Sequence, residues 1–224
     1  MIPRTLEPEV MDTAVEASDY NGMDHSAVNR AFVADFLQTV DDPDFDARSP
    51  RILDVGTGTA LIPIELCRQT ARCRVTAVDL SAEMLHIARQ NVAQSRMAGR
   101  IDTRHIDAKQ LSYEDSCFDA VISNSIVHHI PRPILALAEM LRVLRPGGLL
   151  FVRDLLRPND VETVEHLVRT YAAGENAHQQ QMFRDSLHAA LMVEDVREML
   201  VELDRSPEWV TQTTDRHWTI IGQT

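Results

Sequence analysis

Two hydrophobic periodicities alternate through the middle of the chain. Short runs rich in β-branched and other apolar residues, each typical of a strand, occupy residues 51–55, 74–79, 101–106, 118–123 and 148–154. The stretches between them repeat apolar residues every three or four positions, as one face of a helix does, over residues 61–69, 82–94 and 134–144. Strands and helices that alternate at this spacing favour a parallel sheet covered by helices on both faces.

Local signals predict where these helices begin and end. Ser81 is a suitable N-cap for the helix over 82–94. Pro63 is tolerable in the first turn of the preceding helix, where a missing N–H costs nothing. We expect Pro146 and Gly147 to end the helix over 134–144.

The N-terminal flank predicts a helical cap. Apolar residues at four-residue steps from Val28 to Val40 indicate an amphipathic helix, with Asp24 as its candidate cap. The acidic, proline-bearing run over 41–50 then resembles a linker. Residues 1–50 are therefore expected to form a helical cap and linker.

The C-terminal third predicts helices followed by a hairpin. Helical patterns cover 160–172 and 180–203, and two short strands over 209–224 are joined by residues 214–216. We expect residues 51–224 to form one domain, in which 155–207 are a helical lid insert and the final hairpin extends the sheet edge.

Composition limits the classes of protein that fit. The net charge is −12, from 22 basic and 34 acidic residues, and the densest charge run is acidic, so a nucleic-acid partner is disfavoured. No run of about 18 apolar residues predicts a membrane span, and the first residues do not resemble a signal peptide. Three cysteines without metal spacing indicate reduced thiols, so we expect a cytoplasmic protein.

The stretch ILDVGTGTA, residues 52–60, predicts a ligand site. A strand that enters a glycine turn and then a helix is the first unit of a doubly wound sheet, whose ligands lie at the carboxyl ends of the strands. A dinucleotide fingerprint needs glycine or alanine where Leu61 stands, and the lysine of a P-loop is missing. The observed spacing is instead D-x-G-x-G-x-A, from Asp54 to Ala60.

This spacing resembles the first motif of the class I S-adenosylmethionine-dependent methyltransferases. The resemblance extends over residues 51–154 through AVDLSAEML, HIDAKQL, FDAVISNSIVHHI and LRVLRPGGLLFV, and is nearest to the ubiquinone and menaquinone C-methyltransferases. It implies a doubly wound α/β fold with a seven-stranded, mostly parallel sheet of order 3-2-1-4-5-7-6, with strand 7 antiparallel. Ala60 replaces a glycine that many members carry, and alanine is small enough to keep the backbone close.

The chemistry of S-adenosylmethionine matches residues along these motifs. A carboxylate at Asp79, at the end of the second strand, suits the two ribose hydroxyls, and Asp54 suits the methionine ammonium group. Apolar walls and an acceptor suit the adenine, and close backbone suits the methionine end. The candidate cofactor residues are Asp54, Gly56, Thr57, Gly58, Asp79, Leu80, Met84, Asp107, Ala108 and Asn124.

The catalytic and acceptor-binding residues are less determined. His128 and His129 are candidate general bases, together with Asn124 near the reacting methyl group; the alternative is that one histidine packs and the other is solvated. Candidate acceptor contacts are Tyr20, His25, Asn29, Arg153 and Asp154. No histidine spacing is typical of a metal site, so no metal is expected.

The predicted reaction is in-line displacement of the methyl group from S-adenosylmethionine to a small-molecule acceptor, which leaves S-adenosylhomocysteine. Alternatives are a nicotinamide-dependent dehydrogenase, a non-catalytic S-adenosylmethionine-binding module, and a methyltransferase that acts on nucleic acid or protein. The acceptor and the oligomeric state stay open, with a homodimer as one alternative.

Overall fold

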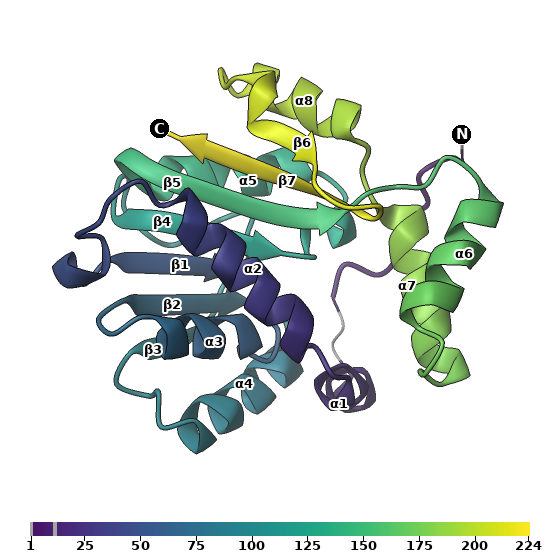
Figure 1. Ribbon diagram of the computed structural model, residues 1–224, viewed down its shortest axis with the longest axis horizontal. Helices are drawn as coiled ribbons and strands as arrows, with labels where there is room; N and C mark the ends of the chain where they lie inside the picture. Colours follow the sequence, from purple (N-terminus) through teal and green to yellow (C-terminus); the bar gives the residue numbers. More distant parts are fainter. Residues whose placement is uncertain (1, 11–12) are drawn as a thin grey trace. The chain divides into compact units, whose positions relative to one another are not determined.

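Seven strands form one sheet in the order β3-β2-β1-β4-β5-β7-β6 (Figure 1). This computed structural model describes residues 2–10 and 13–224. The strands are β1 (Arg51–Val55), β2 (Arg74–Asp79), β3 (Ile101–His105), β4 (Phe118–Asn124), β5 (Leu144–Leu155), β6 (Val210–Gln212) and β7 (His217–Gln223). The order is the one predicted from the sequence.

Helices connect and flank the strands. The α-helices are α1 (Ala14–Gly22), α2 (Ser26–Thr39), α3 (Leu61–Gln69), α4 (Ala82–Gln94), α5 (Pro133–Val143), α6 (Val161–Tyr171), α7 (Ala177–Ala189) and α8 (Val193–Glu202). Three 3-10 turns are η1 (Asp46–Arg48), η2 (Val127–His129) and η3 (Pro207–Trp209). Ser81 caps α4 as predicted, because its side chain accepts a hydrogen bond from the Met84 N–H.

The strand directions also match the prediction. β1 lies between β2 and β4 and is parallel to both, and β2 is parallel to β3. β7 is antiparallel to β6. Backbone hydrogen bonds from Thr224 to Gly148 and from Leu156 to Arg216 run antiparallel along β5 and β7. The predicted doubly wound fold, with an antiparallel final hairpin at the sheet edge, is confirmed.

Two predicted helix ends were wrong. α5 ends at Val143, and β5 begins at Leu144 and runs through Pro146 and Gly147. The Val143 carbonyl accepts a hydrogen bond from the Cys117 N–H, so non-local pairing replaces the next helical turn. The helix predicted over 180–203 is divided into α7 and α8, because Leu191 between them forms a parallel bridge with Leu156.

The segment predicted to be a linker is tied to its neighbours. Residues 41–50 contain η1, and the Asp46 carboxylate accepts backbone hydrogen bonds from Ala71, Arg72 and Cys73. His25, not Asp24, holds the N-cap position of α2, although the Asp24 carboxylate accepts the Ser26 N–H at 2.9 Å.

The chain divides into two compact units. One comprises Val10–Asn124, Leu135–Val152 and Ile221–Thr224, and the other comprises Met1–Glu9, Ser125–Ile134 and Arg153–Ile220. The core of the first includes edge-to-face contacts of Phe151 with Phe32 and Phe36, at centroid distances of 5.1 and 5.8 Å. A separate core in the second unit packs apolar residues of α6 and α7, including Val164, Leu167 and Leu187. That residues 155–207 act as a lid stays a prediction.

We expect Gly148→Ala to destabilise the sheet. A Cβ atom there would lie 2.8 Å from the Arg145 carbonyl oxygen and 3.2 Å from the Asp119 carbonyl oxygen. Both oxygens belong to the backbone of the sheet, so they cannot move aside as the end of a flexible side chain could. The expected loss is about 1–3 kcal/mol of unfolding free energy, measured by urea denaturation. Gly174→Ala is the control, because nothing lies within 4 Å of its added Cβ. Equal stabilities of the two variants would contradict the prediction.

Candidate functional site

The turn after β1 folds over the carboxyl end of β2. Gly56 and Gly58 adopt φ angles of 73° and 53°, in the left-handed region where glycine is unstrained. The N–H groups of Gly56 and Thr57 both donate to the Val78 carbonyl at 2.9 Å. The Gly58 N–H donates to Asp79 Oδ2 at 2.7 Å, so the glycine turn and the predicted ribose carboxylate are directly joined.

Asp54 and Asp79 are the acidic groups of this turn. Burial, with a smaller contribution from the charge of Asp79, raises the pKa of Asp54 to about 7, although the Thr57 side chain lowers it. Burial also raises the pKa of Asp79, against hydrogen bonds that its carboxylate accepts from the backbone of Ser81 and Gly58. Two neighbouring buried carboxylates whose pKa values are raised are suited to a ligand that brings positive charge and hydroxyl groups.

Three buried polar atoms of the turn have no hydrogen-bond partner in the described structure: Asp54 Oδ2, Thr57 Oγ1 and Thr59 Oγ1. Buried polar atoms are nearly always satisfied, so a cluster of exceptions indicates a missing partner. The predicted methionine end of S-adenosylmethionine offers an ammonium donor and carboxylate acceptors for such atoms. Thr59 was not predicted as a site residue; only its burial in the fold reveals it.

Tyr20 in α1 lies beside this turn. A Cβ atom added to Gly58 would lie 3.7 Å from Tyr20 Cε1. Burial, together with the charges of Asp79 and Asp54, raises the pKa of the Tyr20 hydroxyl to about 12. The ring stacks on His25 at a centroid distance of 4.5 Å, so two of the predicted acceptor contacts stand together near the predicted cofactor residues. Asn29 lies farther along, buried in α2.

The predicted adenine residues are engaged to different degrees. Leu80 is half-buried after β2, and Met84 is buried in the first turn of α4. Asp107 accepts a hydrogen bond from the Lys109 N–H and pairs with the Lys109 ammonium at 2.9 Å. Partial burial raises the pKa of Asp107, but these Lys109 contacts outweigh it and lower the pKa. Asn124 is the last residue of β4.

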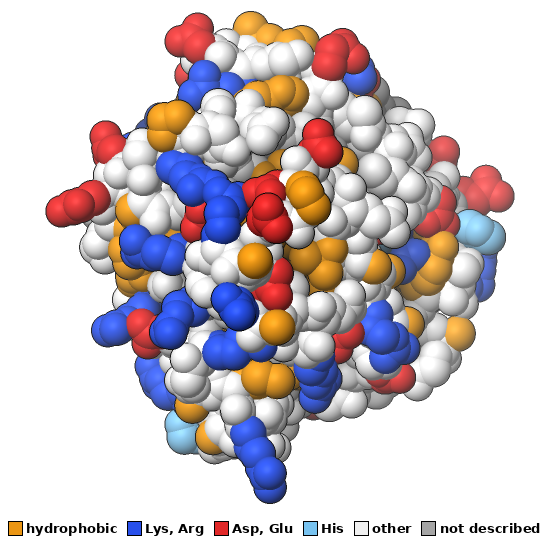
Figure 2. Space-filling view, turned by 60° about the vertical axis from the view of Figure 1, so that its left-hand side comes forward, with side chains coloured by type: hydrophobic (Ala, Val, Ile, Leu, Met, Phe, Trp, Pro, Cys, Tyr) orange, Lys and Arg blue, Asp and Glu red, His pale blue; other side chains and the backbone are white. Residues whose placement is uncertain are grey.

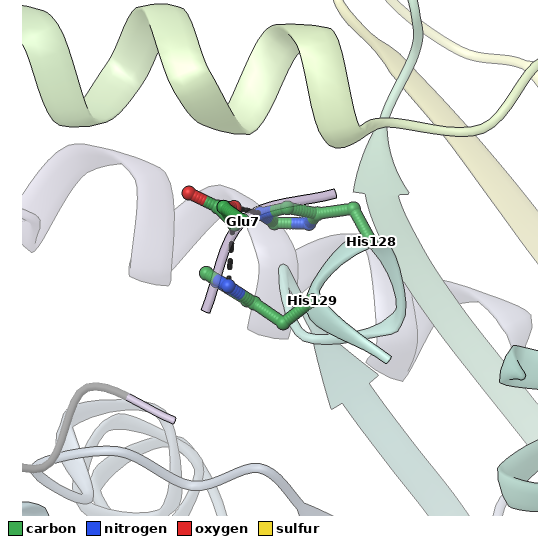
Figure 3. Close-up of side chains that lie close together, drawn as sticks. All are labelled: Glu7, His128 and His129. Carbon is green, nitrogen blue, oxygen red and sulfur yellow. Dashed lines mark ion pairs between the residues drawn. The ribbon is translucent and has the colours of Figure 1, made fainter. Parts of the chain in front are cut away.

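The other unit gathers the two predicted catalytic histidines. His128 and His129 occupy η2, and Glu7 lies against both (Figure 3). The Arg4 guanidinium holds this N-terminal segment in place by donating to the carbonyls of His128 and Ile130 at 3.0 and 3.2 Å. Glu7 and Arg4 were missed by the sequence analysis, because no motif places a residue before α1 beside η2.

Asp154 anchors His128 from the side opposite Glu7. The Asp154 Oδ1 atom lies 2.5 Å from His128 Nδ1, and Oδ2 accepts the Val127 N–H. Burial raises the pKa of Asp154, but the His128 charge and these hydrogen bonds lower it below its usual value. Asp154 is fully buried, and its carboxylate oxygens also accept hydrogen bonds from the backbone N–H groups of His128 and Leu155.

The two histidines differ in their electrostatic surroundings. Burial lowers the pKa of His128, but Asp154 and Glu7 outweigh burial and raise it. Burial and the charge of His128 lower the pKa of His129 to about 3. Burial raises the pKa of Glu7, which accepts a hydrogen bond from Ser186. Arg153, another predicted contact, is buried and donates to Thr219 at 3.1 Å.

Comparison with known proteins identifies the family. Residues 53–152 match the family model described as a methyltransferase domain. A ubiquinone/menaquinone biosynthesis C-methyltransferase of Geotalea daltonii is 32% identical over 56% of this chain and 53% of its own length. A ubiquinone biosynthesis O-methyltransferase of Xylella fastidiosa is 32% identical over 74% of this chain and 70% of its own. The chain spans about half the length of several other curated relatives that it matches.

The fold is similar to that of a solved structure. A crystal structure from Methanococcus maripaludis, of a protein assigned to the S-adenosylmethionine-dependent methyltransferases, covers 98% of this chain with a TM-score of 0.69 at 18% identity. No helix in residues 2–10 and 13–224 has the length and apolarity needed to cross a membrane. The motifs, the strand order and these relatives agree, so this chain belongs to the class I S-adenosylmethionine-dependent methyltransferases.

Proposed function

We propose that this chain transfers the methyl group of S-adenosylmethionine to a small-molecule acceptor. The observation that carries the proposal is the turn after β1, where buried polar atoms of Asp54, Thr57 and Thr59 have no hydrogen bond of ordinary geometry in the described structure and the Asp79 charge lies close to Asp54. The family match covers this same segment. When bound, S-adenosylmethionine supplies an electrophilic methyl group on a positively charged sulfur.

Each residue of the turn has a proposed part in holding the methyl donor. The Asp79 carboxylate accepts backbone hydrogen bonds from Gly58, Ser81 and Leu80, and its remaining acceptor capacity is proposed to serve the ribose hydroxyls. Asp54 accepts the ammonium group. Gly56, Thr57 and Gly58 bring backbone against the methionine end, while Leu80, Met84, Asp107 and Ala108 border the adenine. Alignment in such a dry site is worth up to roughly 7–11 kcal/mol of barrier.

His128 is the better of the two catalytic candidates. Its Nδ1 atom is held by Asp154 at 2.5 Å, so its Nε2 atom carries the lone pair, whereas the His129 ring has no such partner at Asp154 and lies 3.1 Å from Glu7 Oε1. In the sequence, His128 comes four residues after Asn124, the last residue of β4. We therefore expect His128→Ala to lower turnover more than His129→Ala does.

The relatives guide the choice of acceptor. The two relatives from Geotalea daltonii and Xylella fastidiosa are named as a C-methyltransferase of ubiquinone and menaquinone biosynthesis and an O-methyltransferase of ubiquinone biosynthesis. We therefore propose an electron-rich small molecule with a phenolic or quinol character. A nucleic acid is disfavoured, since the net charge is −12 and several arginines are paired with acidic residues, as Arg104 is with Asp102 and Arg145 with Asp119. On the face in Figure 2, Lys and Arg side chains gather over the left and lower part with a few acidic side chains among them, so it is the net charge that disfavours a nucleic acid.

Transfer of a labelled methyl group tests the proposal. The chain is incubated with methyl-tritiated S-adenosylmethionine and a panel of phenols, quinols, amines, thiols, lipids and RNA, and labelled products and S-adenosylhomocysteine are quantified. We expect transfer to small aromatic acceptors. Tight binding of S-adenosylmethionine without transfer to any acceptor would favour a non-catalytic binding module, and transfer to RNA alone would overturn the acceptor class.

Tyr20→Phe is expected to weaken binding of S-adenosylmethionine by about 2- to 10-fold, the worth of one neutral hydrogen bond. The ring that stacks on His25 stays, and only the hydroxyl near Asp54 and Asp79 is lost. Isothermal titration calorimetry measures the change. Tyr171→Phe is the matched control, because that hydroxyl donates to Asp215 in the other unit. Unchanged affinity in Tyr20→Phe would place the hydroxyl outside the donor site.

A further inference from the structure

The contacts of Glu7, His128 and His129 have an unusual feature. Glu7 Oε1 lies 3.5 Å from His128 Nε2 and 3.1 Å from His129 Nδ1, and one ligand atom of each residue lies within 4.8 Å of the other two. His128 Nε2 and His129 Nδ1 are nevertheless buried without a hydrogen-bond partner in the described structure. The Glu7 carboxylate therefore faces both imidazoles (Figure 3), and the three residues offer one oxygen and two nitrogen atoms, close together, that could bind a metal ion.

The histidine rings are held in the orientation that metal ligands need. A metal-bound histidine usually gives its other ring N–H to a carboxylate or a backbone carbonyl, which fixes the ring and leaves the lone pair toward the ion. For His128 that group is Asp154, 2.5 Å from Nδ1. For His129 the ring donates to the Pro8 carbonyl. His128 is 2% exposed, so its free nitrogen is aimed into the protein and not at bulk water.

The separations suit a small ion. Zn–N and Zn–O bonds of about 2.0–2.1 Å at tetrahedral angles place neighbouring ligand atoms about 3.3 Å apart. The two observed separations from Glu7 Oε1, 3.1 and 3.5 Å, lie on either side of that value. A set of two imidazoles and one carboxylate is typical of catalytic zinc sites, which leave a fourth position open.

We propose that Glu7, His128 and His129 bind a divalent zinc ion, with Asp154 as the group that orients His128. The ion takes the charge of the Glu7 carboxylate and the lone pairs of His128 Nε2 and His129 Nδ1. Its fourth position accepts an oxygen from water or from a hydroxyl-bearing molecule, and lowers the pKa of that oxygen's proton. The site is assembled within one unit of the chain, so it does not depend on the methyl donor.

Zinc binding to the full chain tests the site directly. Protein treated with EDTA and desalted is titrated with Zn²⁺ by competition with a chromogenic chelator, in the absence of S-adenosylmethionine. We expect one ion per chain with a Kd below about 1 μM. Co²⁺ loading should give the intense visible absorption of a four- or five-coordinate nitrogen and oxygen site. Absence of stoichiometric binding at this affinity would overturn the proposal.

Substitutions identify the ligands. His128→Ala and Glu7→Gln should each weaken Zn²⁺ binding by at least about 100-fold, and Asp154→Asn, which acts through His128, by about 10- to 100-fold. His86→Ala is the matched control, because His86 is exposed on α4 in the other unit, and its affinity should equal that of the wild type. Circular dichroism checks folding, and Glu7→Gln serves if His128→Ala fails to fold.

The outcomes separate a metal site from an ordinary ion pair. Loss of binding in Glu7→Gln and His128→Ala but not in His86→Ala supports the site. Equal Zn²⁺ affinity in all of these variants would show that the ion binds at another site, for example at the thiols of Cys67 and Cys73, whose sulfurs lie 3.9 Å apart. That result would overturn the assignment and leave His128 as a candidate base.

Discussion

Asp54→Asn is expected to stabilise the ligand-free protein at pH 8 while it weakens binding of the methyl donor. Asp54 is 2% exposed, and its carboxyl pKa is raised from 3.8 to about 7. The folded protein therefore binds more protons than the unfolded chain between these two values, so wild-type stability falls as the pH rises through this window. Above pH 7 the penalty is constant, at up to about 4 kcal/mol from about 1.4 kcal/mol per pKa unit.

Urea unfolding of both proteins between pH 4 and pH 8 measures this effect. The stability difference between Asp54→Asn and the wild type should be small near pH 4 and should grow to a few kcal/mol by pH 8. Asp102→Asn, at an exposed position of β3, is the control and should stay within about 0.5 kcal/mol of the wild type. An Asp54→Asn protein less stable than the wild type at pH 8 would contradict the prediction.

Asp79→Asn is expected to reduce affinity for S-adenosylmethionine by about 100-fold or more. Hydrogen bonds to a charged group contribute about 1.5–3 kcal/mol each, and Asp79 is proposed to accept two from the ribose. An asparagine keeps only one acceptor oxygen, and the Gly58 and Ser81 N–H groups already compete for the acceptors at this position. Isothermal titration calorimetry measures the loss.

A second ligand separates the two aspartates. 5′-Methylthioadenosine has the ribose and adenine of the methyl donor but lacks the amino-acid end. Asp79→Asn should weaken binding of both ligands, whereas Asp54→Asn should weaken only S-adenosylmethionine, by about 10- to 100-fold. If Asp79→Asn bound 5′-methylthioadenosine as the wild type does, its carboxylate would not contact the ribose.

Much of the central sheet was predictable because its signals are local. The apolar runs predicted over 51–55 and 74–79 match β1 and β2 residue for residue. The errors came from non-local pairing. Leu191 bridges Leu156, 35 residues earlier in the chain, and this contact divides α7 from α8 where helical periodicity continues.

The candidate site shows the same difference between local signals and long-range contacts. The glycine turn after β1 and the carboxylate at the end of β2 could be located from the sequence, because their spacing is local, and their part in binding the methyl donor stays a prediction. The partners of His128 could not be located in this way, since Glu7 and Asp154 lie 121 residues before and 26 residues after it.

The sequence by itself determined the alternation of strands and helices, because this rests on short-range patterns of apolar residues, and its resemblance to the class I methyltransferases implied the family and the strand order. Which residues face the methyl donor stays a prediction. Only the tertiary structure decided the pKa of Asp54 and which side chains contact His128. Burial raised the Asp54 pKa, and chain reversal brought Glu7 and Asp154 to opposite sides of His128. Desolvation and long-range contacts are properties of the packed chain, and no local spacing encodes them.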